Sequence, residues 1–194
     1  MNRVARAAEL IGQPVVTLDQ ATTAGEVRDV LIDPERSRLV GFTVRGTGLL
    51  GSPLVGILPA EGVQSIGRDA VMIATESSII RGREGMQASL GQHQDIIGKE
   101  VVTDGGASLG EVTDIVLEVD GPSARVVGYE VARPDGQKLM VPISGGVPLS
   151  RDALVLPAES EQHAVTGLNQ LRQSVEHGRP ETPHDRSSTR VVKK

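Results

Sequence analysis

The chain has 194 residues, a formal net charge of -5 and no cysteine. The lack of cysteine excludes disulfides, thiolate nucleophiles and cysteine-based zinc sites, and it fits a reducing cytoplasm. The negative charge disfavours nucleic acid as the main partner. No apolar run reaches the roughly 18 residues of a membrane span, and no signal-peptide pattern follows Met1, so we expect a cytoplasmic protein.

The first half of the chain has the pattern of short β-strands separated by turns. Residues 2–11 are expected to form a lead-in with one helical turn that ends near Leu10. Asp33-Pro34 marks a turn, because proline fixes φ where a turn needs it. The apolar residues of 39–45 then alternate with period two, which is typical of a half-buried strand. Further strands are expected over residues 15–18, 26–32, 54–58, 63–66 and 70–73.

The same order of short sequence blocks returns in the second half. Ile11-Gly12 is matched by Ile97-Gly98, and Val40-Gly41-Phe42 is matched by Val127-Gly128-Tyr129. Short strands punctuated by Gly, Pro and Asp are typical of a small antiparallel barrel, so we expect two copies of one. The single phenylalanine and the single tyrosine share one repeat position and are expected to lie in the core. The matched structural positions are Gly12 and Gly98, Gly25 and Gly110, Asp29 and Asp114, Phe42 and Tyr129, and Pro59 and Pro142.

The end of the chain has a helical pattern instead. Ser160 and Glu161 suit the start of a helix, and Gly178 suits its end, so we expect an amphipathic helix over 161–177. Its apolar face packs either on its own barrel or against another chain, and both interpretations stay open at this point. Residues 179–194 are rich in basic residues, Pro, Ser and Thr and are expected to be disordered. The apolar face consists of Val165, Leu168, Leu171 and Val175.

The ordered set of blocks resembles the PRC-barrel family. Its pattern runs from Ile-Gly-x-x-Val-Val through Gly-x-Val-x-Asp and Val-Gly-Phe/Tyr to a closing Asp-Ala-apolar strand. The resemblance covers residues 11–74 and 97–157, although a longer turn at 118–122 replaces the Asp-Pro turn in the second copy. It implies a small all-β docking module, generally without catalytic residues. Its best-known members are the cytoplasmic domain of the photosynthetic reaction-centre H subunit and the C-terminal domain of the ribosome-maturation factor RimM.

These observations predict an all-β fold with two tandem small antiparallel β-barrels that are PRC-barrel-like, followed by a C-terminal amphipathic helix. The expected division of the chain is a first barrel domain over 1–78, a linker over 79–94, a second barrel domain over 95–158, a helix over 159–178 and a basic tail over 179–194.

Two motifs suggest binding chemistry but have simpler explanations. Residues 46–51 spell Gly-x-Gly-x-x-Gly, yet a dinucleotide fingerprint requires a helix next, and a strand is expected there. Asp29 and Asp114 are either paired carboxylates for acid–base or metal chemistry, or strand-end residues that bond the neighbouring backbone. Their presence in both copies favours the structural role, because a single active site needs only one copy. The four histidines, at 93, 163, 177 and 184, lie outside both expected barrels, so we expect no catalytic residue, cofactor or metal site.

The leading functional hypothesis is a non-catalytic cytoplasmic adaptor that binds an unidentified protein, and a homodimer stays open. The first alternative is a ribosome-associated maturation or assembly factor, based on the resemblance and the basic tail. The second alternative is a small-molecule or metal-sensing module, based on the aspartate pair. The candidate contact residues are Gly46, Gly48, Leu49, Leu50, Arg133, Lys138, Val165, Leu168, Leu171 and Val175.

Overall fold

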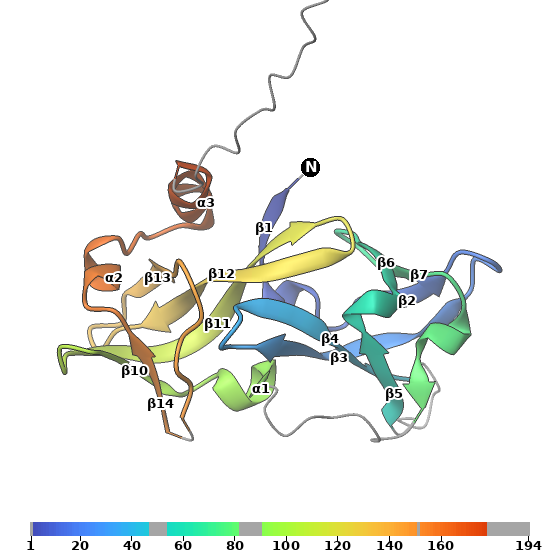
Figure 1. Ribbon diagram of the computed structural model, residues 1–194, viewed down its shortest axis with the longest axis horizontal. Coiled ribbons are helices and arrows are strands. Elements are labelled where there is room, and N and C mark those ends of the chain that lie inside the picture. The colour runs from blue at the N-terminus through green and yellow to red at the C-terminus, as the bar shows by residue number, and fades with distance from the viewer. Residues whose placement is uncertain (1, 47–53, 82–90, 151, 178–194) are drawn as a thin grey trace, which may run out of the picture.

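The computed structural model describes residues 2–46, 54–81, 91–150 and 152–177. Gly48, Leu49 and Leu50 of the glycine-rich loop and the basic tail 179–194 lie outside these residues. The described part is mostly β-strand, which confirms the expected fold class at that level. Its strands form one 14-stranded sheet, so the two repeats are joined rather than separate (Figure 1).

The two repeats contribute similar successions of strands to the sheet, except that β6 of the first repeat corresponds only to an isolated bridge, Leu149 with Leu154, in the second. Neighbouring strands are antiparallel except where the last strand of a repeat returns beside the first, as Val15 opposite Val71 and Val101 opposite Leu154 show. The expected antiparallel pairing is therefore found between the other strands but not at this point, because the chain crosses over instead of closing a hairpin. The first repeat consists of β2 (Pro14–Thr17), β3 (Thr23–Asp33), β4 (Arg38–Arg45), β5 (Leu54–Pro59), β6 (Val63–Ile66) and β7 (Val71–Ile73). The second consists of β10 (Glu100–Thr103), β11 (Ser108–Asp120), β12 (Ser123–Ala132), β13 (Lys138–Pro142) and β14 (Ala153–Leu156).

The two repeats exchange the segments that precede them. Strand β1 (Arg3–Arg6) lies before the first repeat in sequence but pairs with β11 of the second, with Ala5 opposite Leu117. Strand β9 (Gly91–Gln92) lies before the second repeat but pairs with β3 of the first, with Gly91 opposite Ile32. Each repeat therefore completes the sheet of the other. The expected helical turn in 2–11 is limited to the 3-10 helix η1 (Ala7–Glu9), because the residues before it are used as a strand.

The turns between the long strands also reach across to the opposite repeat. The amide of Val147 donates to the carbonyl of Pro34 at 3.1 Å, and the hydroxyl of Ser37 donates to the carbonyl of Gly145 at 2.7 Å. In the opposite direction, the amide of Ile66 donates to the carbonyl of Gly121 at 2.9 Å. The expectation of a longer turn in the second repeat is wrong, because β11 and β12 extend to residues 120 and 123 and leave a turn of only 121–122, against 34–37 in the first repeat. Both turns nevertheless dock on the opposite repeat.

The helix expected over 161–177 is broken into two pieces. Helix α2 (Glu159–Gln162) ends early, and α3 (Leu168–His177) begins after Val165 has formed a β-bridge with Met140. The apolar spacing that suggested one helix is therefore shared between a bridge and a helix. In the first repeat, β8 (Ile80–Arg81) pairs with Ile57 at the equivalent edge. The remaining short elements are η2 (Ala60–Gly62), η3 (Glu76–Ser78) and α1 (His93–Ile96).

The two repeats share one apolar core. Phe42 and Tyr129 are fully buried in it at equivalent positions, as expected from the repeat. Pro59 and Pro142 are likewise matched, opposite Gly41 and Gly128. A second, smaller cluster lies on the outer face of the second repeat, where Leu171 of α3 packs with Val116, Val127 and Met140.

Candidate functional site

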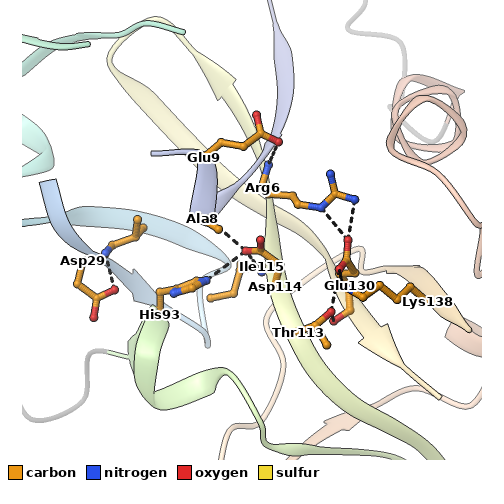
Figure 2. A network of polar contacts seen from close by, with 11 residues as sticks. Arg6, Ala8, Glu9, Asp29, His93, Thr113, Asp114, Ile115, Glu130 and Lys138 are labelled. Atoms are coloured by element: carbon orange, nitrogen blue, oxygen red, sulfur yellow. Dashed lines mark hydrogen bonds and ion pairs between the residues drawn. The ribbon is translucent and has the colours of Figure 1, made fainter. Parts of the chain in front are cut away.

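A buried histidine–aspartate pair lies where the repeats meet. Nε2 of His93 is 3.1 Å from Oδ1 of Asp114, and the two residues are 8% and 4% exposed. The same oxygen accepts the amides of Ile115 at 2.8 Å and Ala8 at 3.2 Å. Figure 2 shows Asp114 between the histidine and the segment that follows β1. The pair therefore joins three parts of the chain that are distant in sequence.

Asp29 occupies the equivalent position in the first repeat and has fewer partners. Its Oδ1 accepts the amide of Val30 at 2.8 Å, whereas its buried Oδ2 has no hydrogen-bond partner among the described residues. Burial raises the pKa of Asp29, and the bond from Val30 and the nearby His93 only partly oppose this effect. Both aspartates bond the neighbouring backbone, but the expectation that they are strand-end residues is wrong: each lies inside a long strand, at a register shift, and accepts the amide of the next residue. They differ in their partners, since His93 bonds directly to Asp114 and not to Asp29.

A second buried carboxylate, Glu130, ties β1 to β12. Its side chain is 4% exposed, and its Oε2 accepts a bond from Nε of Arg6 at 2.7 Å and forms an ion pair with Nη2 of Arg6 at 2.7 Å. Lys138 and Thr113 donate to its other oxygen, each at 2.9 Å. Burial by itself raises the pKa of Glu130, but these bonds outweigh it and hold the pKa below its ordinary value. The matching position in the first repeat is Thr43, whose buried hydroxyl has no partner among the described residues.

The described residues bring no side-chain nucleophile to the His93–Asp114 pair. A histidine held by a carboxylate can act as a general base, but it then needs a nucleophile within hydrogen-bond reach. Within the described ranges, no hydroxyl bonds to His93, and no group of three or more Asp, Glu or His residues is arranged to hold a metal. The polar network accounts for the attachment of β1 and α1 to the sheet, so its geometry is that of a structural junction.

The candidate contact residues of the second repeat are largely engaged within the chain. Nη2 of Arg133 lies 3.8 Å from Oε1 of Glu161, and Lys138 bonds Glu130. Leu171 is fully buried against the outer face of the sheet, and α3 contacts β13 and β1. Val165, Leu168 and Val175 are half-buried around the same cluster, and Gly46 lies at the edge of the described residues.

A pocket of about 530 Å³ lies between the two C-terminal helices and the outer side of β12 and β13. Its volume lies within the range of small-molecule sites. The apolar part of its wall comes from Pro142, Ile143, Pro157 and Val175. The polar part comes from Arg125, Ser144, Glu159, Ser160, His163 and Ser174.

Comparison with protein families shows which family the chain belongs to. The PRC-barrel domain matches it twice, over residues 2–78 and 92–163. The chain belongs to the PRC-barrel family. The two matches agree with the repeat seen in the sequence; the first includes the exchanged strand β1, and the second begins at Gln92, the last residue of β9. None of the curated proteins matches this PRC-barrel chain. Its described residues contain no helix long and apolar enough to cross a membrane.

Sequence reasoning missed the main members of the polar junction. It treated His93 as a linker residue, whereas the structure buries it in α1 against Asp114. It assigned no role to Glu130 or Arg6, which are paired across 124 positions of sequence. A signal for Glu130 was present, since it is the charged residue within the otherwise apolar run 126–132, and such a residue normally needs a buried partner.

Proposed function

We propose that this PRC-barrel protein is a non-catalytic interaction module of the cytoplasm, built from two barrel-like repeats that act as one rigid platform. One observation carries the proposal: the buried ionisable side chains that would suit catalysis join strands instead. Asp114 and Glu130 accept bonds from segments that enter from the other repeat. Buried charges arranged in this way stabilise a platform and leave binding to its outer surface.

The proposed contact surface is the outward side of the second repeat. The β12–β13 turn exposes residues 134–137, and α3 exposes Asn169 and Gln170 on the side away from Leu171. The turn is tied to α2 by the ion pair of Arg133 with Glu161, and α3 is anchored to the sheet by Leu171. Exposed residues on anchored elements favour binding because little conformational entropy is lost when a partner docks.

Affinity capture from a native lysate, followed by mass spectrometry, tests the proposal. A chain ending at Pro157 is a poor control, because removal of α3 uncovers Val116, Val127 and Met140 and would retain proteins non-specifically. Single substitutions at exposed positions avoid this problem. We compare Gln137→Arg and Asn169→Arg with Gln64→Arg, a matched change on β6 of the first repeat.

The expected result is a protein retained by the parent and by Gln64→Arg, and lost with Gln137→Arg or Asn169→Arg. Ribosomal proteins in the captured set would favour the assembly-factor alternative. Self-association in sedimentation, abolished by the same two substitutions, would identify the partner as a second copy. A captured set that is the same for all three variants, or empty, would refute the assignment of this surface.

A further inference from the structure

We infer that the pocket beneath the C-terminal helices binds a small apolar monocarboxylate, a function separate from protein docking. The pocket exists because the C-terminal segment is broken. Val165 is held against Met140 by bonds of 2.6 and 2.9 Å, and α3 then continues to Leu171, which is buried on the sheet. A hollow of about 530 Å³ remains beside these two anchor points, with walls from α2, α3 and the strands.

The lining favours a ligand with an apolar body. Pro142, Ile143, Pro157 and Val175 supply carbon surface from three different segments of the chain. Ile143 is 9% exposed and Val175 packs against the outer apolar cluster, so this part of the wall is fixed by the fold. Small-molecule pockets typically combine such an apolar wall with a few placed polar groups.

Arg125 supplies a cation whose position is set by the fold. Its Nε donates to Oε2 of Glu118 at 2.6 Å, and the Glu118 side chain is only 5% exposed. A guanidinium has five N–H donors in a planar fork, and this bond uses the inner one. The Arg125 side chain remains 44% exposed at the pocket wall, where the outer N–H groups suit a carboxylate.

The other polar groups suit one negative charge rather than several. Nδ1 of His163 donates to the carbonyl oxygen of Glu159 at 2.9 Å, which leaves Nε2 as the ring nitrogen without this bond. Ser160, which is 7% exposed, adds a hydroxyl to the same wall. Glu159 opposes dense negative charge, which disfavours a phosphate. One guanidinium, hydroxyl groups and an apolar wall together fit a monocarboxylate.

Two sources present this chemistry, a free apolar acid and the C-terminal carboxylate of an apolar peptide. The full-length protein, labelled with ¹⁵N, is titrated with octanoate, and amide chemical shifts report both the site and the affinity. Octanol and octylamine test the need for the negative charge. An apolar tetrapeptide with a free C-terminus and its C-terminal amide test the peptide source.

The expected result is saturable octanoate binding with amide shift changes centred on residues 143–144, 158–163 and 174–175, and binding at least tenfold weaker for octanol and octylamine. Arg125→Gln should weaken octanoate binding about tenfold or more, since a charge-assisted bond is lost. Arg81→Gln is the matched control, because Arg81 also pairs with a glutamate, Glu76, but lies far from the pocket in the first repeat.

Ser174→Phe provides a second test that leaves the Arg125–Glu118 pair in place. Ser174 is exposed on α3 at the pocket wall, so a phenyl ring there should fill the hollow and abolish octanoate binding while the fold is retained. Equal affinity for octanoate and octanol would overturn the inference. So would shift changes elsewhere on the protein, or unchanged affinity in both Arg125→Gln and Ser174→Phe. Tight binding of the free-acid peptide, and not of octanoate, would assign the site to peptide C-termini.

Discussion

Replacement of Glu130 by glutamine should destabilise the whole chain, because this carboxylate holds β1 to the second repeat. The substitution keeps the shape of the side chain but removes the charge that accepts bonds from Arg6 and Lys138. Breaking a buried ion pair costs about 3–5 kcal/mol when the remaining charge stays buried. Here Arg6 and Lys138 are 36% and 61% exposed and regain water, so we expect about 2 kcal/mol.

Urea and thermal unfolding measure this change directly. For a chain of this size, about 2 kcal/mol corresponds to a fall of about 4–8 °C in Tm. Hydrogen exchange should also show faster exchange for the amides of β1, because Arg6 carries the lost bonds. Glu76→Gln is the matched control: Glu76 pairs with Arg81 at 2.6 Å, but both side chains are exposed, so the change should be within about 0.5 kcal/mol.

The loss of stability caused by Glu130→Gln should become smaller as the pH falls. The folded-state pKa of Glu130 lies below its ordinary value of 4.5. Such a carboxyl contributes stability that is present above the unfolded-state pKa and lost as the pH falls through the folded-state pKa. The difference between the parent and Glu130→Gln should therefore shrink below about pH 4.5. Equal losses for Glu130→Gln and Glu76→Gln at pH 7, or a difference that grows on acidification, would refute this reasoning.

Four further predictions concern packing and the repeat-equivalent aspartates. Leu171→Ala should cost about 2–5 kcal/mol in urea unfolding, because Leu171 is fully buried against the outer face of the sheet. Gly146→Ala should lower Tm far more than Gly145→Ala, because a Cβ at Gly146 would lie 1.7 Å from the carbonyl oxygen of Glu35, whereas one at Gly145 meets nothing within 4 Å. Asp114→Asn should cost about 1–3 kcal/mol at pH 7, because its carboxylate accepts bonds from His93 and two amides. Asp29→Asn should be close to neutral or stabilising in the same assay, because burial raises the pKa of Asp29 and its ionisation above that pKa penalises the folded state.

The repeat was predictable from sequence because a fold requirement leaves the same residues at the same positions in both copies. Gly25 and Gly110 illustrate this, since a Cβ at Gly110 would lie 2.1 Å from the carbonyl oxygen of Ala132, and one at Gly25 would lie 2.8 Å from that of Arg45. Such close backbone approaches admit only glycine. The exchange of β1 and β9 left no comparable signal. Strands of four and two residues are too short for their periodicity to indicate which partner they choose.

The C-terminal segment shows why the spacing of apolar residues alone could not predict where its helices begin and end. Val165, Leu168, Leu171 and Val175 lie at helical intervals, and all four pack on the same outer cluster. The spacing therefore identified the buried face correctly. It could not identify the break, because Val165 reaches that face by bonding the edge of β13 rather than through a helical turn. The pocket follows from this break, and for that reason it was also missed.

Positions that differ between the repeats show that the two exchanged strands are held unequally. Gln92 occupies the place of Arg6, and Thr43 occupies the place of Glu130, so β9 lacks the pair of charge-assisted bonds that fixes β1. His93, which follows β9, contacts the aspartate of the second repeat, and the Oδ2 atom of Asp29 remains without a partner among the described residues. The charged contacts at the junction therefore gather on the second repeat, the same repeat that carries α3 and the pocket. A fold requirement acts on both copies, so an additional function is expected to use residues that are present in only one of them. In this chain the unmatched charged contacts and the pocket lie on the second repeat.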